Sequence, residues 1–182
     1  MRLRYRTIAG EFHIHYPDIP RNGPQPDGDT ISFKADDLSL IESLPRFGIR
    51  RPDINTRGII GVPFEAIDSL ETHFRGSHQE PVLAYMARDF MLAHMGFRDI
   101  VFYDDMPDVV RSVSNNPLRG HILANGIDGN GRVLAFVYPG YSAEPDGAPT
   151  FVDAELMRAS ANLAGLNAGL RMRPSTRASR WT

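Results

Sequence analysis

The sequence predicts an α+β protein in which a small antiparallel barrel of strands packs against helices. Several segments alternate apolar and polar residues, as half-buried strands do, and turn-rich connections of the kind that join antiparallel neighbours separate them. Two segments with helical spacing of apolar residues interrupt these strands, one mid-chain and one near the end. At 182 residues, without internal repeats or a clear linker, the chain is expected to form a single domain spanning residues 1–182.

The first half of the chain contains three predicted strands. Residues Tyr5–Tyr16 alternate well, and the loop Pro17–Gly28, with four prolines and two glycines, ends this strand. Residues Asp29–Ala35 alternate in the same way and form the second strand. A short helix, Leu38–Leu44, follows, and the apolar, β-branched segment Gly58–Ile67 is the third strand.

The second half is expected to begin with a helix and to continue with further strands. Residues Ser77–Glu80 match a capping box, and the apolar face from Leu83 to Phe97 predicts the helix that follows it. An Asp-Gly-Asn-Gly turn predicts a hairpin farther along the chain. The remaining predicted elements are three strands, Asp99–Tyr103, Leu118–Asn125 and Arg132–Tyr138, and a final helix, Asp153–Ala164.

Composition narrows the function classes. The net charge is −2 and the pI is about 6.3, so no overall basic signal for nucleic acid is present. Cysteine is absent, which excludes disulfides, thiolate metal sites and cysteine nucleophiles. No apolar run predicts a membrane span, and no signal peptide is visible, so the cytoplasm is the default location and secretion the alternative. Residues 167–182 are expected to form a basic tail, either disordered or truncated.

Acidic residues stand at two strand ends that an antiparallel pairing would bring together. Asp29 opens the second predicted strand within QPDGDT, and Asp68 closes the third within IDSLE. Two carboxylates with a backbone carbonyl and water suit a hard cation, and Glu71 would stand near enough to take a proton from a water. Arg132, directly after the hairpin turn, would neutralise charge on a phosphate. The alternative is that Asp27 and Asp29 only stabilise a turn.

Four segments, DGDT, IDSLE, GNGRVLAFVY and FVDAELMR, follow one another with a predicted helix between the second and third. In this order they resemble the staphylococcal-nuclease (thermonuclease) family, over roughly Tyr5 to Leu166. The resemblance implies an OB-fold, a five-stranded antiparallel barrel with packed helices. It also implies an endonuclease activity, the Ca²⁺-dependent hydrolysis of DNA and/or RNA phosphodiesters by in-line attack of water, with nucleic acid as the substrate and partner.

The resemblance also implies roles for individual residues. Ca²⁺, with Mg²⁺ as the other possibility, would be held by Asp29, Asp68 and the backbone carbonyl of Ser69. Glu71 matches the family's general base or water-orienting carboxylate. Arg132 matches the second of two arginines that hold the scissile phosphate.

The chain departs from the family pattern at two places. The family's first arginine falls on Pro63, which has no charge and no donor, and losing one such donor commonly costs about 10²–10³ in rate. Arg75 and His73, in the loop after Glu71, are the candidate substrate-binding residues. The C-terminal end also differs from the family. A second reading is therefore a catalytically degenerate OB-fold module that binds nucleic acid or protein, and a third is an inactive fragment.

Overall fold

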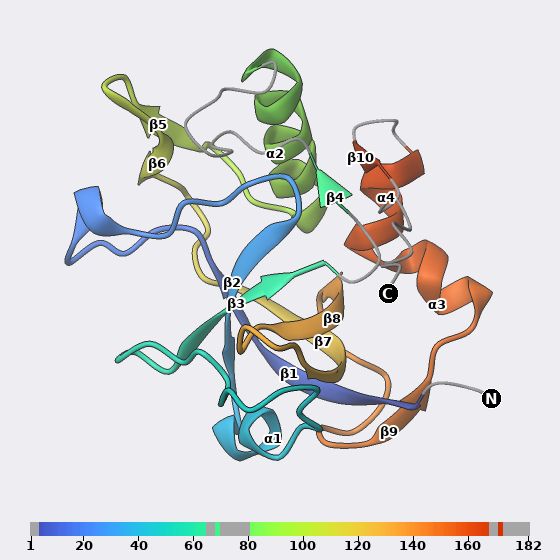
Figure 1. Ribbon diagram of the computed structural model, residues 1–182. Helices are drawn as coiled ribbons and strands as arrows, with labels where there is room; N and C mark the ends of the chain where they lie inside the picture. The colour runs from blue at the N-terminus through green and yellow to red at the C-terminus, as the bar shows by residue number, and fades with distance from the viewer. Residues whose placement is uncertain (1–3, 65–67, 70–80, 168–170, 173–182) are drawn as a thin grey trace, which may run out of the picture.

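The computed structural model describes residues 4–64, 68–69, 81–167 and 171–172 (Figure 1). It confirms the α+β class, because most strands lie in one antiparallel sheet and a few helices pack beside it. The strands are β1 (Arg4–His13), β2 (Thr30–Ala35), β3 (Ile59–Pro63), β4 (Asp68–Ser69), β5 (Val101–Tyr103), β6 (Met106–Ser112), β7 (Leu118–Ile127), β8 (Val133–Pro139), β9 (Pro149–Phe151) and β10 (Arg171–Met172). The helices are η1 (Pro20–Asn22), α1 (Leu38–Glu42), α2 (Pro81–Met95), α3 (Ala154–Ala159) and α4 (Ala161–Asn167).

The main sheet is built around β1. Its strand order is β3-β2-β1-β7-β8, and β9 pairs with the start of β1. One edge of β1 pairs with β7, with Arg6 opposite Ala124. The other edge pairs first with β9 and then with β2, where His13 lies opposite Ser32. The ten residues of β1 therefore connect both halves of the sheet.

The two ends of this strand path approach each other. Phe64, directly after β3, forms an isolated parallel bridge with Ala135 of β8. Within the described residues this single bridge, rather than a continuous ladder, links β3 to β8, so the predicted closed five-stranded barrel is not established. The established arrangement is an antiparallel sheet of six strands whose end strands meet at one point.

Two glycines allow aromatic rings to lie directly on the sheet. Gly10 of β1 and Gly120 of β7 are paired residues. A Cβ on Gly120 would stand 2.2 Å from Cε2 of Phe12, and one on Gly10 would stand 2.5 Å from Cζ of Phe33. The two rings lie with centroids 5.0 Å apart and are completely buried in the core. Glycine at both positions therefore makes room for the aromatic centre of the core.

Helix α2 closes the core on one side. Its residues Met91, Leu92 and Met95 are buried in the main hydrophobic cluster. Arg88 on the same helix is also buried, with its guanidinium carbon 3.8 Å from the centroid of the Phe102 ring and its Nη1 donating to the carbonyl of Pro107 at 2.8 Å. This arginine fastens the β5–β6 hairpin to α2.

Helix α4 covers the backbone of β8. The side chain of Asn162, itself 1% exposed, accepts a hydrogen bond from Val137 N at 2.9 Å and donates one to Ala135 O at 3.1 Å. A helix side chain thus takes the place of a neighbouring strand along this part of β8. None of the helices within the described ranges is long and apolar enough to cross a membrane.

The elements differ from the sequence prediction in several places. The third strand ends at Pro63 rather than Ile67, and residues 65–67 lie outside the described part. The predicted final helix is two helices, because Ser160 takes an extended backbone conformation between α3 and α4. Strands β6, β9 and β10 were not predicted. Of the predicted basic tail, the structure describes Asn167 in α4 and the two residues of β10.

Candidate functional site

The Asp-Gly-Asp segment before β2 forms a turn organised by Asp27. Its Oδ1 accepts hydrogen bonds from Asp29 N at 3.1 Å and Thr30 N at 2.8 Å. Such side-chain bonds to the backbone two and three residues on are the usual way in which Asp stabilises a turn. Thr30 Oγ1 in turn donates to Asp29 Oδ1 at 3.2 Å. The predicted turn-forming role is therefore confirmed for Asp27, while Asp29 presents its carboxylate at the start of the strand.

The two carboxylates of this turn are electrostatically coupled. Burial, reinforced by the negative charge of Asp29, raises the pKa of Asp27 to about 7, although backbone hydrogen bonds from Asp29 and Thr30 oppose the shift. Loss of water contact and a neighbouring negative charge both disfavour the ionised form of the Asp27 carboxyl. A cation beside these carboxylates would relieve this repulsion. Asp27 was not among the predicted ligands. The Asp-x-Asp spacing is the sequence feature that places its carboxylate near that of Asp29.

The end of β3 lies beside Asp29. Phe64 N donates to Asp29 O at 2.7 Å, and Thr30 pairs with Pro63. Asp68 follows Phe64 by four residues, which places its Cα within about 14 Å of that of Phe64. The backbone of Asp68 and Ser69 forms β4, paired with β10. The meeting of the Asp29 and Asp68 carboxylates stays a prediction.

Pro63 occupies the position at which the resemblance expects an arginine. It is half-buried and lies opposite Thr30, one residue from Asp29. Its pyrrolidine ring carries neither charge nor a donor, so this residue cannot bind a phosphate as an arginine would.

Arg132 follows the β7–β8 turn and is held by Asp128. Its Nε and Nη2 lie 2.9 and 2.8 Å from Asp128 Oδ2, while Asp128 Oδ1 accepts from the backbone N of Arg132 and of Asn130, each at 2.9 Å. Burial alone would raise the pKa of Asp128, but these hydrogen bonds outweigh it and hold the pKa below its ordinary value. The Arg132 side chain remains 56% exposed. The sequence did not indicate this carboxylate clamp.

Strand order relates Arg132 to Asp29. Phe64 touches Asp29 through its backbone and bridges Ala135, so these three residues lie at one level of the sheet. Arg132 comes three residues before Ala135, about 10 Å along β8. The backbone of Arg132 thus lies about 10 Å from that level, on the side of the β7–β8 turn, and its guanidinium is engaged by Asp128.

Glu71, His73 and Arg75 lie outside the described residues, so their predicted roles stay predictions. Within the part of the chain that the structure describes, no group of three or more His, Asp or Glu side chains is arranged to hold a metal ion. Among the predicted ligands, Asp29 is the one whose side chain is described. In comparisons with known proteins, no family model, curated sequence or solved structure matches this chain.

Proposed function

We propose that this chain is a Ca²⁺-dependent phosphodiesterase, an endonuclease that hydrolyses DNA and/or RNA. The observation that carries the proposal is the place of Asp29, which the Asp27 turn holds at the start of β2 beside the end of β3. A hydrogen-bonded turn fixes one carboxylate and leaves the other at a strand end, where a second acidic segment follows within a few residues. A hard cation is the ligand that such acids suit best.

The fold we propose is an OB-fold barrel. The path β3-β2-β1-β7-β8 supports it, because a closed five-stranded barrel requires its two end strands to be neighbours. The parallel bridge between Phe64 and Ala135 is the contact that such closure would contain. Closure would place the start of β2, the end of β3 and Ala135 of β8 at one level of the barrel.

Each residue of the site would have its own role in the hydrolysis. Asp29, Asp68 and the carbonyl of Ser69 would hold the cation, which when bound neutralises charge on the scissile phosphate. Glu71 would accept a proton from the attacking water as its oxygen forms a bond to phosphorus. The opposite phosphorus–oxygen bond breaks, and the departing oxygen takes a proton from solvent. His73 and Arg75 would contact the substrate.

Arg132 would hold a phosphate oxygen with the part of its guanidinium that Asp128 leaves exposed. The clamp uses Nε and Nη2, and Nη1 has no partner within the described residues. A guanidinium fixed on one edge is pre-oriented to donate from the other.

The alternative function is a binding module that no longer cuts. The observation that favours it is Pro63, which stands beside the acid turn where a second cationic donor is expected. Such a module would bind the cation together with either nucleic acid or a protein, and it would not cleave phosphodiesters.

A digestion assay tests the proposal. Single-stranded DNA, circular DNA and RNA are incubated with the protein and Ca²⁺, with and without a chelator. Asp29→Asn and Glu71→Ala should each abolish cleavage, while Glu144→Ala, which removes an exposed loop carboxylate, should leave it unchanged. Cleavage that survives the chelator or Glu71→Ala would contradict the assignment of roles.

Calorimetry with Ca²⁺ separates the two functions. Calcium binding that Asp29→Asn removes, without cleavage of any substrate, would favour the binding module. Absence of calcium binding would reject the cation site itself.

A further inference from the structure

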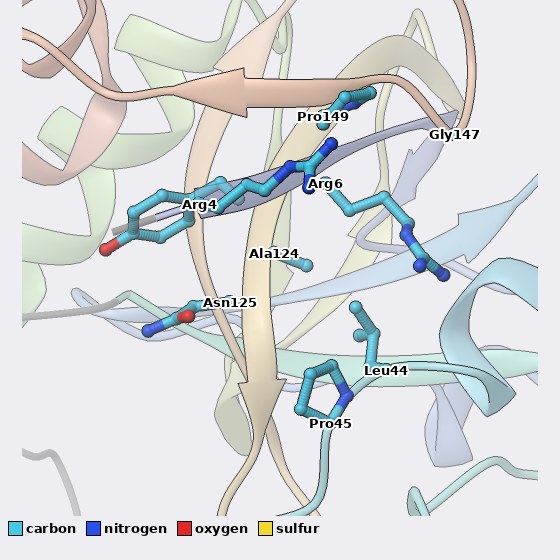
Figure 2. Close-up of a pocket in the computed structure, with 9 residues that line it drawn as sticks. Arg4, Arg6, Leu44, Pro45, Ala124, Asn125, Gly147 and Pro149 are labelled. Atoms are coloured by element: carbon cyan, nitrogen blue, oxygen red, sulfur yellow. The ribbon is translucent and has the colours of Figure 1, made fainter. Parts of the chain in front are cut away.

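A cavity of about 430 Å³ opens at the start of β1, between the sheet and the segment that follows α1 (Figure 2). The side chains of Arg4 and Arg6 run along one side of it, and Leu44 and Pro45 lie on the opposite side. Ala124 of β7 lies between them. We refer to it as the Arg4–Arg6 cavity.

Two arginines give the lining of the cavity a positive charge. Arg4 and Arg6 are two residues apart on one strand and therefore share a face. Neither forms an ion pair with an acid in the described ranges, and no acidic residue lines the cavity. Arg6 Nη1 donates to Ser43 Oγ at 2.6 Å, which orients its guanidinium. Two arginines in a chain whose net charge is −2 are thus concentrated in one hollow.

The remaining walls suit a ligand larger than a simple ion. Leu44, Pro45 and Ala124 make part of the lining apolar, and Asn125 adds a side-chain amide. Outside the lining, the ring of Phe47 lies over Gly126, the residue after Asn125, where an added Cβ would stand 2.6 Å from its Cε2. The ring is 61% exposed, which leaves it open for stacking.

This cavity is remote from the acid turn. Arg6 pairs with Ala124 near one end of β1, whereas His13 pairs with Ser32 near the other. Seven residues of extended strand separate these positions, about 23 Å. A ligand in the Arg4–Arg6 cavity would therefore bind independently of Asp29.

We propose that the Arg4–Arg6 cavity binds a phosphate group. Guanidinium groups match phosphate oxygens in geometry and charge, and a phosphate dianion would compensate the two arginines. The volume lies within the range of about 300–1,000 Å³ in which small-molecule ligands are held, so a phosphate ester such as a nucleoside monophosphate fills the space better than the free ion. This inference does not depend on the proposed nuclease activity.

NMR titrations of the full chain locate and rank the ligands. The probes are inorganic phosphate, adenosine monophosphate and uncharged adenosine, at constant ionic strength. Both phosphate compounds should shift the backbone amide resonances of Ala124, Asn125 and Gly147, and adenosine should not. Tighter binding of the monophosphate than of inorganic phosphate identifies an ester as the ligand, and equal binding identifies the phosphate ion alone; both support the proposal.

Two variants test the arginines. Replacing both Arg4→Gln and Arg6→Gln should weaken phosphate binding by about 10- to 100-fold, the loss expected for charge-assisted hydrogen bonds. Arg98→Gln, which removes an exposed arginine elsewhere, should change nothing. Circular dichroism confirms that each variant is folded. Three results would each overturn the proposal. The folded double variant could bind phosphate as tightly as the parent, the shifts could be confined to the start of β2, or neither phosphate compound could cause a shift.

Discussion

Replacing Gly10 by alanine tests the packing of the aromatic centre of the core. The new Cβ would stand 2.2 Å from the backbone carbonyl oxygen of Lys34 and 2.5 Å from the ring of Phe33. Because one obstacle is backbone and the other is a completely buried ring, β1 and β2 must separate until these contacts reach at least 3.0 Å. Overpacking of this kind costs about 1–3 kcal/mol, and we expect the upper end, about 3 kcal/mol.

Urea and thermal unfolding, followed by circular dichroism, measure this cost. For a protein of this size, about 3 kcal/mol lowers the midpoint of thermal unfolding by roughly 6–12 °C. Gly61→Ala is the matched control, because Gly61 is also a strand glycine but its added Cβ would meet only Thr30 Cγ2, at 4.0 Å. The control should lie within about 1 kcal/mol of the parent. Equal stability of the two variants would refute the register of β1 against β2 or the position of Phe33.

Three further predictions concern the site and its pH dependence. Pro63→Arg should raise the rate of metal-dependent cleavage about 10²- to 10³-fold, because residue 63 lies opposite Thr30, the neighbour of Asp29. An unchanged single-turnover rate would show that other parts of the site have also diverged. Asp27→Asn should raise the free energy of unfolding, measured in urea, more at about pH 8 than at about pH 4. The pKa of Asp27 in the folded state is raised to about 7, so the stability that this residue contributes is lost as the pH rises through that value. An equal effect of the substitution at both pH values would contradict this. His121→Phe, which preserves the stacking on Tyr138, should reduce the loss of stability on acidification. Burial lowers the pKa of His121 in the folded state. The stability that neutral His121 contributes is therefore full above about pH 6.5 and is lost as the pH falls through the folded-state pKa. Urea midpoints at several acidic pH values measure it, and a variant as acid-sensitive as the parent would contradict it.

Local pattern predicted the elements that carry their own signal. The alternation of Thr30–Ala35 and the Asp-Gly-Asn-Gly turn before Val133 are properties of neighbouring residues, so β2 and the β7–β8 hairpin were anticipated. The three-residue β9 was missed because its partner, β1, lies far away in sequence and supplies the pairing. Pro107 and Asp108 near the start of β6 are typical of a loop and concealed that strand.

The sequence specifies the candidate site only as residue types, and the cation site itself stays a prediction. Asp29 was identified because a carboxylate beside a turn at a strand end is visible in the sequence. The raised pKa of Asp27 depends on burial, and the engagement of Arg132 by Asp128 depends on the conformation of the hairpin turn. Both are consequences of three-dimensional packing, which neighbouring residues do not specify.

The side chain of Asn162 bears on how molecules of this protein remain separate. A strand at the margin of a sheet exposes hydrogen-bonding groups that a second molecule can use to extend the sheet, a common first step in aggregation. By occupying Val137 N and Ala135 O, one asparagine withdraws these groups from intermolecular pairing. The docking of a seven-residue helix, α4, thus keeps this stretch of the β8 backbone occupied.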